Sequence, residues 1–134
     1  MLKSVYTFKV AWGDTDAAGI VFYPNFYKWM DQATGGLFHS IELPLSSLFV
    51  HEKIALPLLE THCVFKKPAC FEDEIHVETQ VLELRDKVFK LEHAFYRGET
   101  LLASGYEVRA WTSFAEGSPK AVTIPESVRA SLIR

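Results

Sequence analysis

Cysteine is scarce in this chain, and its scarcity excludes two kinds of scaffold. Cys63 and Cys70 are the only cysteines among 134 residues. They lack the Cys-x-x-Cys spacing of a structural zinc site, and they are too few for a disulfide framework. We therefore expect two reduced thiols, as in proteins of the cytoplasm.

Positive charge is also in short supply. The 14 lysines and arginines are outnumbered by 17 aspartates and glutamates, which gives a net charge of −3. Binding of nucleic acid in bulk needs a net or clustered positive field, so nucleic acid is not an expected partner. A single anionic ligand held by a few local cations remains compatible with this balance.

Long apolar runs are missing as well. The segment 1–9 contains no apolar stretch long enough for a secretory signal. No other stretch approaches the roughly 20 apolar residues that a transmembrane helix needs. We therefore expect a cytoplasmic protein that does not have a membrane as its partner.

What the chain does contain is the composition of a globular protein. Hydrophobic residues make up 49% of it and charged residues 23%, which is an ordinary balance. The sequence shows no internal repeat, low-complexity tract or linker. Its length suits one domain, so we predict a single domain over residues 1–134.

The apolar pattern after residue 24 predicts the main helix. Pro24 suits the first helical turn, where its missing N–H needs no partner. Apolar side chains then recur at the i, i+3, i+4, i+7 spacing of one buried helix face: Phe26, Trp29, Met30, Ala33 and Leu37. This pattern predicts a helix of about four turns.

Strands dominate the rest of the chain. A strand is predicted over 5–12, followed by a polar loop over 13–19 and, after the main helix, a short helix over 45–52. Further strands are predicted over 56–67, 75–84, 88–96, 101–114 and 121–124, and a terminal helix over 125–133. A strand, a helix and then consecutive strands is the order of an α+β protein with an antiparallel sheet. We predict a sheet of about five to six strands around one long central helix.

One segment resembles a known family. The run Trp12–Phe26 contains Asp-x-Asp, two small residues, Gly, Ile-Val, an aromatic pair and Pro-Asn-aromatic. It resembles the signature of the 4-hydroxybenzoyl-CoA thioesterase family, and Trp29–Ala33 and Phe65–Asp73 fit the same family. The resemblance implies the hotdog fold, hydrolysis of an acyl-CoA to the free acid and CoA, and no metal or organic cofactor. It also implies a homotetramer, a dimer of dimers with its sites at the dimer interface.

The resemblance places the essential carboxylate at Asp16. Thioester hydrolysis needs a nucleophile for the carbonyl or a base that activates water, and a carboxylate can serve as either. A structural alternative is that Asp14 and Asp16 shape a turn at the helix entry, a common use of aspartate. We favour that structural role for Asp14 and catalysis for Asp16.

The start of the predicted helix would supply a second requirement of the reaction. Unpaired N–H groups and the helix dipole stabilise an oxyanion at that end. Because Pro24 has no N–H, the backbone N–H of Tyr23 is the candidate donor, and Gly19 would let substrate approach closely. The same field stabilises a carboxylate in its ionised form, which suits nucleophilic attack by Asp16 through a mixed anhydride better than general-base catalysis.

Two departures from a related branch bear on the substrate. Short-chain acyl-CoA thioesterases of the Tol-Pal envelope system have a tyrosine four residues before the essential aspartate and a histidine seven residues after it. Trp12 and Tyr23 stand at those positions here. The resemblance therefore excludes a histidine-assisted mechanism and favours an aromatic acyl group, 4-hydroxybenzoyl or benzoyl.

Three other functions are alternatives to this one. The first is a thioesterase for short or medium aliphatic acyl-CoA or for acyl carrier protein, and the second is a non-catalytic domain that binds acyl thioesters. The third, a dehydratase of the same fold, would carry a histidine near the helix start, and residues 13–29 contain none.

Two more candidates for substrate binding lie on the predicted helix. Tyr27 and Asp31 fall on the same side as Tyr23, one and two turns further on. Asp31 is either an exposed carboxylate or a polar group at the acyl pocket. In the resembling family an aspartate at this position can accept a hydrogen bond from the phenol of the substrate.

Several ionisable side chains outside the motif are further candidates. Glu60 is a candidate second carboxylate, although a structural role is favoured, and His39 and His62 are interpreted as structural. Five cations near strand ends belong either to solvated surface or to a site for the CoA phosphates: Lys66, Lys67, Arg85, Lys87 and Lys90.

Overall fold

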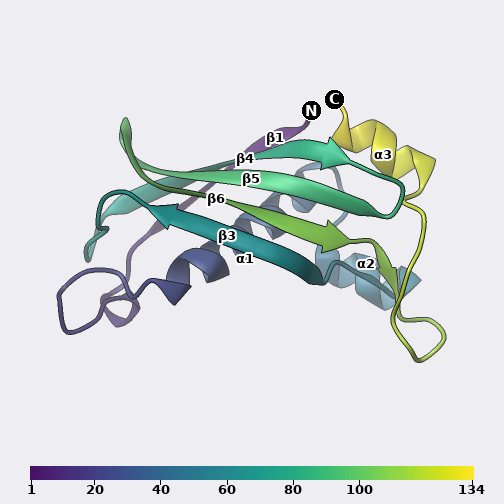
Figure 1. The fold of residues 1–134 in the computed structure, drawn as a ribbon, viewed down its shortest axis with the longest axis horizontal. Helices are drawn as coiled ribbons and strands as arrows, with labels where there is room; N and C mark the ends of the chain where they lie inside the picture. Colours follow the sequence, from purple (N-terminus) through teal and green to yellow (C-terminus); the bar gives the residue numbers. More distant parts are fainter.

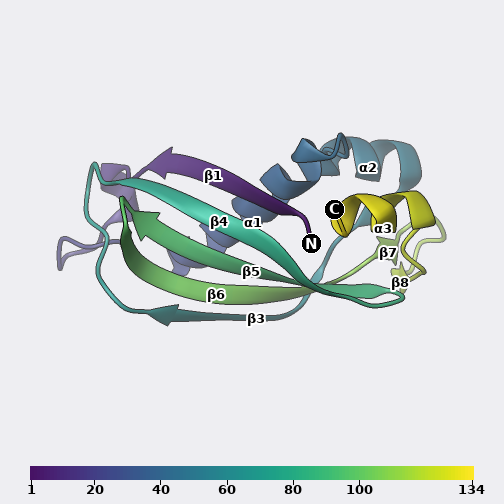
Figure 2. The ribbon, with the colours of Figure 1, turned by 90° about the horizontal axis from the view of Figure 1, so that it is seen from above.

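The computed structural model describes all 134 residues. Its centre is a five-stranded antiparallel sheet in the order β1-β4-β5-β6-β3. The strands are β1 (Lys3–Lys9), β3 (Leu58–Phe65), β4 (Glu74–Leu84), β5 (Val88–Arg97) and β6 (Thr100–Ala110). The sheet curves around one long helix, α1 (Pro24–Ser40), as Figures 1 and 2 show. This arrangement confirms the predicted α+β class.

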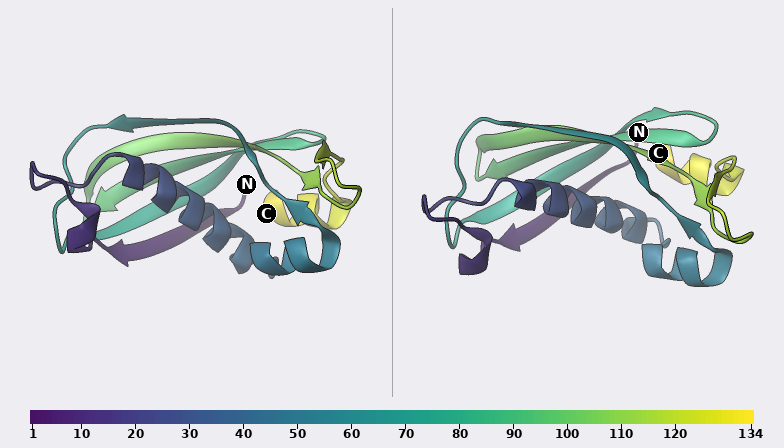
Figure 3. Two further views of the ribbon diagram at one scale, coloured as in Figure 1. Left: turned by 90° about the horizontal axis from the view of Figure 1, so that it is seen from below. Right: turned by 60° about the horizontal axis from the view of Figure 1, so that its bottom comes forward.

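The smaller elements gather at one end of the molecule. They are α2 (Leu45–Glu52), α3 (Glu126–Leu132) and a three-stranded sheet of β2 (Ile54–Ala55), β7 (Thr112–Ser113) and β8 (Lys120–Ala121). The two chain ends meet there, where the Leu2 N–H donates to the Leu132 carbonyl at 2.9 Å. Figure 3 shows α1 lying in the concave face of the sheet, with the loop before it at the opposite end from α2 and α3.

Three predicted strands have wrong boundaries, and one of them, expected over 121–124, is β8 at Lys120–Ala121. The strand expected over 5–12 ends at Lys9, and residues Trp12–Asp14 form a short 3-10 helix, η1. The strand expected over 101–114 breaks at Trp111, whose N–H bonds to the Lys87 carbonyl as the chain passes from the large sheet to the small one. Apolar residues continue through that break, so the sequence gives no sign of it.

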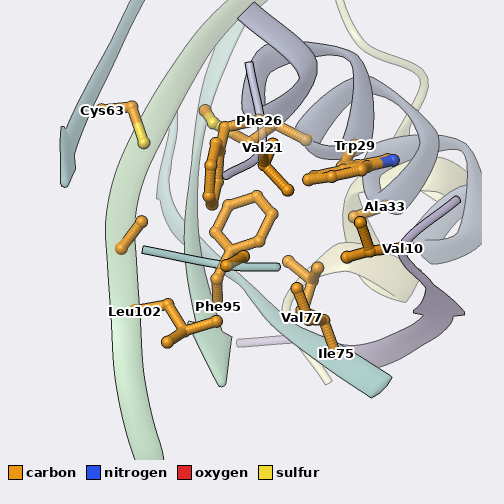
Figure 4. Packing of buried hydrophobic residues seen from close by; sticks show 13 residues of the cluster. Val10, Val21, Phe26, Trp29, Ala33, Cys63, Ile75, Val77, Phe95 and Leu102 are labelled. Atoms are coloured by element: carbon orange, nitrogen blue, oxygen red, sulfur yellow. The ribbon is translucent and has the colours of Figure 1, made fainter. Parts of the chain in front are cut away.

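Helix α1 begins at Pro24 as predicted and runs 17 residues, nearly one turn longer than expected. Its buried face contains the five predicted residues together with Thr34 and Phe38. The first half of this face packs on the sheet through aromatic rings, and Figure 4 shows Phe26, Trp29 and Phe95 together in this part of the core. Between ring centroids, Phe26 lies 5.0 Å from Phe95 and Trp29 lies 4.2 Å from Phe8.

Two apolar clusters fill the space between α1 and the sheet. The first lies under the first half of the helix and is centred on Phe26, Trp29 and Phe95. The second lies under its last turns and includes Leu37, Phe38, Phe89, Leu91 and Trp111. A line of buried polar side chains, here named the polar row, runs between the clusters: Thr34, Thr79, His93, Glu107 and Arg109.

The edge at β3 is the open side of the fold. This strand ends the sheet, and Cys63 is its only buried residue. Leu58, Thr61 and Phe65 share the inner face with Cys63, because they pair with the inward-facing residues of β6. The inner surface beside β3 is therefore largely uncovered in a single chain.

Candidate active site

The segment between η1 and α1 folds back on itself as a tight turn. Thr15 and Val21 pair as an antiparallel bridge, and the Asp16 N–H donates to the Ile20 carbonyl at 2.9 Å. The Gly19 N–H closes the turn on the Asp16 carbonyl at 2.9 Å. Gly19 has a φ of 79°, a left-handed conformation that glycine adopts without steric cost.

Only one oxygen of the Asp16 carboxylate is engaged. Oδ1 accepts the Ala18 N–H at 2.8 Å, the local turn that aspartate commonly makes. Oδ2 has no hydrogen-bond partner, and the side chain is exposed. Asp16 therefore does shape the turn, and it still has one free carboxylate oxygen.

The backbone N–H of Tyr23, at the start of α1, is unpaired. The Phe22 N–H donates to the Asp14 carbonyl at 2.8 Å, and the Asn25 N–H donates to the Phe22 carbonyl at 3.0 Å. Pro24 has no N–H. The N–H of Tyr23 makes no hydrogen bond, and it lies at the positive end of the helix dipole.

Asp14 joins the turn to the helix. Its carbonyl accepts the Asn25 side-chain amide at 2.8 Å as well as the Phe22 N–H. Its carboxylate accepts the Ala11 N–H at 2.8 Å and lies 3.6 Å from the Lys28 ammonium. These contacts give Asp14 the structural role that was favoured for it.

An apolar cavity of about 370 Å³ opens beside the helix start. Its walls come from the turn, α1 and the segment after β3: Ile20, Val21, Tyr23, Phe26, Phe65, Lys66, Lys67, Pro68 and Ala69. The Phe65 ring lies 6.3 Å from Tyr23 and 5.2 Å from Phe26 between centroids. The volume falls in the range of small-molecule sites, so an acyl group can lie here next to the free Tyr23 amide.

Tyr27 and Asp31 do not line this cavity. Tyr27 is half-buried and packs against the first apolar cluster. The Asp31 side chain is 64% exposed, and its Oδ1 lies 2.8 Å from Nη2 of Arg109. Eight residues separate Tyr23 from Asp31, which is about 12 Å along the helix axis. A single chain therefore keeps Asp31 away from the helix start.

Four of the five candidate cations lie in two places, and Lys87 lines neither of them. Lys66 and Lys67 border the apolar cavity. Their backbone N–H groups both donate to the Leu102 carbonyl, at 2.8 and 3.0 Å. Arg85 and Lys90 line a separate hollow of about 200 Å³ together with acidic side chains.

Other candidate groups lie away from the cavity or are unreactive. The Glu60 carboxylate accepts the hydroxyl of Tyr106 on the outer face of the sheet, which raises the pKa of Tyr106. His62 lies on the same face, with its ring 5.5 Å from that of Tyr106. Burial raises the pKa of the Cys63 thiol to about 11, so it is protonated and a poor nucleophile.

The structure contains neither a cluster of metal-binding side chains nor a membrane-spanning helix. No group of three or more histidine, cysteine, aspartate or glutamate side chains converges as metal ligands would. No helix is long and apolar enough to cross a membrane.

Sequence reasoning missed the polar row. Glu107 receives hydrogen bonds from Thr34 and from Arg109, and its Oε1 lies 3.0 Å from Nε2 of His93. Nδ1 of His93 lies 2.8 Å from the Thr79 hydroxyl. A signal was present for Thr79, His93, Glu107 and Arg109, because they occupy inward positions of strands that alternate with period two, whereas Thr34 lies on α1.

The charges of the polar row compensate one another. Burial alone would raise the pKa of Glu107, but hydrogen bonds from His93 and Arg109 outweigh it and lower the pKa to about 2. Burial alone would lower the pKa of Arg109, and the carboxylates of Glu107 and Asp31 outweigh it and raise the pKa. Glu107 and Arg109 therefore form a buried ion pair whose polar atoms are satisfied.

Comparison with known proteins gives a consistent family. The sequence profile of the thioesterase-like superfamily matches residues 10–132. The 4-hydroxybenzoyl-CoA thioesterase of Pseudomonas sp. (strain CBS-3) is 32% identical over 91 residues, which are 66% of this chain and 64% of that protein. A 1,4-dihydroxy-2-naphthoyl-CoA hydrolase of Microcystis aeruginosa is 24% identical over 116 residues, 87% of this chain and 83% of that protein.

A solved structure agrees with these sequence relatives. A gentisyl-coenzyme A thioesterase superposes with a TM-score of 0.86 at 44% identity and covers 98% of this chain and 100% of its own. The agreement over nearly the whole length confirms the hotdog fold predicted from the signature of residues 12–26. The chain belongs to the thioesterase-like superfamily and is a hotdog-fold acyl-CoA thioesterase.

Proposed function

We propose that this chain hydrolyses an aromatic acyl-CoA, of the 4-hydroxybenzoyl or benzoyl type, to the free acid and CoA. The observation that carries this proposal is the unpaired N–H of Tyr23 beside an apolar cavity. The Asp16 turn is hydrogen-bonded to the same helix start through the Asp14 carbonyl and has a free carboxylate oxygen. Acyl transfer needs these three features together: a reactive oxygen, an oxyanion donor and an apolar acyl site.

The proposed reaction begins with attack by the free Asp16 oxygen on the thioester carbonyl carbon. The carbonyl oxygen becomes an oxyanion that accepts the Tyr23 N–H, and the dipole of α1 adds to its stabilisation. The C–S bond then breaks, CoA leaves as a thiolate that takes a proton from solvent, and the acyl group remains on Asp16 as a mixed anhydride. Water hydrolyses the anhydride, which releases the acid and restores the carboxylate.

General-base attack by water is the other mechanism compatible with a free carboxylate. A single turnover in water labelled with heavy oxygen separates the two. The anhydride route leaves label on the Asp16 carboxylate, as measured by peptide mass spectrometry. The absence of label there would exclude the covalent route and leave Asp16 as the base.

The cavity wall supports an aromatic acyl group. The rings of Tyr23, Phe26 and Phe65 meet there edge to face, an arrangement that also suits packing against a bound ring. The relatives named for 4-hydroxybenzoyl, dihydroxynaphthoyl and gentisyl thioesters share a ring with at least one hydroxyl. Lys66 and Lys67 at the rim provide cations for the phosphates of CoA.

We further propose a homotetramer built as a dimer of dimers, in which β3 strands of two copies pair. The outer edge of β3 is unpaired, and Leu58, Leu59 and Phe65 along it are 45%, 60% and 44% exposed. Such an edge is a liability unless it is covered. A second copy would also supply a polar group for the far end of an acyl ring. The Asp31 of the same chain lies about 12 Å along the helix from Tyr23, farther than one hydroxybenzoyl group reaches.

A substrate panel tests the proposed function. Thiol release is measured with 4-hydroxybenzoyl-CoA, benzoyl-CoA, aliphatic acyl-CoAs of increasing length and an acyl carrier protein thioester. We expect the highest kcat/KM for the aromatic substrates. A preference for aliphatic thioesters would show that the substrate is aliphatic and not aromatic. No turnover of any thioester would favour the alternative of a non-catalytic domain that binds acyl thioesters.

A further inference from the structure

The start of α1 lacks the side-chain cap that helices commonly have. Tyr23 occupies the capping position, and no side chain accepts an N–H group of the first turn. Serine, threonine, aspartate or asparagine at that position usually accepts one of these N–H groups. A side-chain oxygen there would compete with the proposed oxyanion for the same donors. The uncapped start therefore suits the reaction, but another contact has to fix the direction in which the chain enters the helix.

The side chain of Asn25 provides that contact. Asn25 lies in the first turn of α1, and its Nδ2 donates to the Asp14 carbonyl at 2.8 Å, across 11 residues of the chain. The same carbonyl accepts the Phe22 N–H at 2.8 Å. An asparagine that could serve as a cap elsewhere thus bonds backward, away from the helix, and joins the helix to the segment that leads into the Asp16 turn.

The Asp14 carbonyl is well placed to control the Asp16 turn. The two ends of the turn pair with each other at Thr15 and Val21, and Asp14 comes directly before this pair. Of the two hydrogen bonds that the Asp14 carbonyl accepts, only the one from Asn25 comes from a side chain. A substitution at Asn25 can therefore remove this link and leave the backbone bonds of the turn in place.

A second side chain of α1 reaches Asp14 with a different geometry. The Lys28 ammonium lies 3.6 Å from the Asp14 carboxylate, and the Lys28 side chain is 51% exposed. An exposed ion pair at this distance contributes little, because water and salt screen it. The Asn25 bond is shorter, half-buried and directed at the backbone. Lys28 therefore offers a matched control, a residue of the same helix that contacts Asp14 without fixing its carbonyl.

We infer that Asn25 is a positioning residue for the reaction: it holds the Asp16 turn where the Asp16 carboxylate and the Tyr23 N–H meet one substrate carbonyl. This inference rests on the proposed function, in which the carboxylate attacks that carbonyl and the N–H donates to its oxygen. A displacement of about 1 Å between reacting groups can cost roughly 100-fold in rate. Asn25 acts through the Asp14 backbone and takes no part in making or breaking bonds.

The replacement Asn25→Leu tests this role, because leucine has a similar size and no side-chain donor. We expect kcat on 4-hydroxybenzoyl-CoA to fall about 10- to 100-fold, with KM changed less than about threefold. Lys28→Met removes the exposed ion pair and is expected to keep kcat within about threefold of the wild type.

A double-mutant cycle with Asp16→Asn separates positioning from a general loss of structure. When Asp16 is asparagine, no carboxylate remains to be positioned, so adding Asn25→Leu should lower the residual rate less than about threefold. A purely structural defect would lower the rate by the same factor in both backgrounds. Thermal unfolding verifies that each variant is folded, and if Asn25→Leu is not, the isosteric Asn25→Asp takes its place in the cycle.

Each contrary outcome overturns a different statement. An unchanged kcat in a folded Asn25→Leu variant, or equal losses in both backgrounds, would overturn the positioning role of Asn25. A raised KM at constant kcat would also overturn it and would assign Asn25 to substrate binding. A wild-type chain that hydrolyses no thioester would contradict the proposed function itself, before any variant is compared.

Discussion

At the residue scale, the chemistry depends on two adjacent local structures. The Asp16 turn holds a carboxylate with one free oxygen, and the Tyr23 amide is left unpaired because Phe22 and Asn25 find other partners. The bonds of the Asp14 carbonyl to Phe22 and Asn25 join these structures. A residue without a catalytic role thus organises the residues that we propose to have one.

The role of the Tyr23 amide can be separated from that of the Tyr23 ring by a pair of variants. Tyr23 has φ −54°, close to the value that proline imposes, and its N–H has no partner to lose. Tyr23→Pro should therefore lower kcat by roughly 100- to 1,000-fold, the usual effect of removing one oxyanion donor. Tyr23→Ala is the matched control, since it removes the ring and keeps the N–H. If the alanine variant were as inactive as the proline variant, the result would contradict the proposal that the Tyr23 N–H stabilises the oxyanion.

The lowered pKa of Glu107 predicts how the free energy of unfolding changes at acidic pH. Its pKa is lowered to about 2 from 4.5, so its contribution is complete above pH 4.5 and is lost as the pH falls toward 2. The slope of unfolding free energy against pH in this window should be smaller in Glu107→Gln than in the wild type. Urea unfolding at several pH values measures it, with Glu116→Gln in an exposed loop as the control. Parallel curves for wild type and Glu107→Gln would contradict the assignment.

The candidate site was more predictable than the polar row. Asp16, Gly19 and Tyr23 lie in one continuous segment, so a sequence signature can identify them together. His93, Glu107 and Arg109 come from two strands, and each looks like an ordinary polar residue until the strands are paired. Their common position between two apolar clusters exists only in three dimensions.

At the element scale, β3 must approach β6 closely, and Gly105 permits this. A Cβ on Gly105 would lie 2.3 Å from the His62 carbonyl oxygen, 3.2 Å from the Cys63 Cα and 3.2 Å from Met30 Cε. The glycine thus keeps both the edge strand and α1 against the sheet. Sequence patterns place the strands approximately but give no measure of the separation between β3 and β6.

Gly105→Ala should therefore be strongly destabilising. We expect a loss of at least about 2 kcal/mol, because the new methyl group meets backbone that cannot rotate away. Gly36→Ala is the matched control, since it lies within α1 with nothing within 4 Å of the added Cβ and should stabilise by about 0.5–1 kcal/mol. Chemical denaturation measures both. Similar stabilities for the two variants would contradict the close packing of β3 on β6.

At the scale of the whole molecule, the two edges of the sheet differ. Trp29 of α1 packs against Phe8 of β1, whereas β3 is left exposed beside the cavity. The sequence predicts an antiparallel sheet of about five to six strands around one helix, and the large sheet has five strands. The sequence does not predict which edge the helix leaves open, because that depends on how α1 crosses the sheet.

Assembly through β3 gives a prediction with an internal control. Leu59→Lys places a charge on the β3 edge at a residue that is 60% exposed, and it should shift the assembly toward monomer and lower activity. Val5→Lys makes the same change on the opposite edge strand, at 63% exposure, and should leave the assembly intact. Light scattering after size-exclusion chromatography measures both masses. Dissociation by Val5→Lys alone would place the interface on β1.

Asp16→Asn tests the central claim most directly. Asparagine can still accept the Ala18 N–H and keep the turn, so the substitution removes the charge and little else. The measurement is thiol release from 4-hydroxybenzoyl-CoA at saturating concentration, with thermal unfolding to verify that the variant is folded. We predict that kcat falls at least about 100-fold at an unchanged melting temperature. A folded variant whose kcat stays within about threefold of the wild type would contradict the assignment of Asp16 as the catalytic residue.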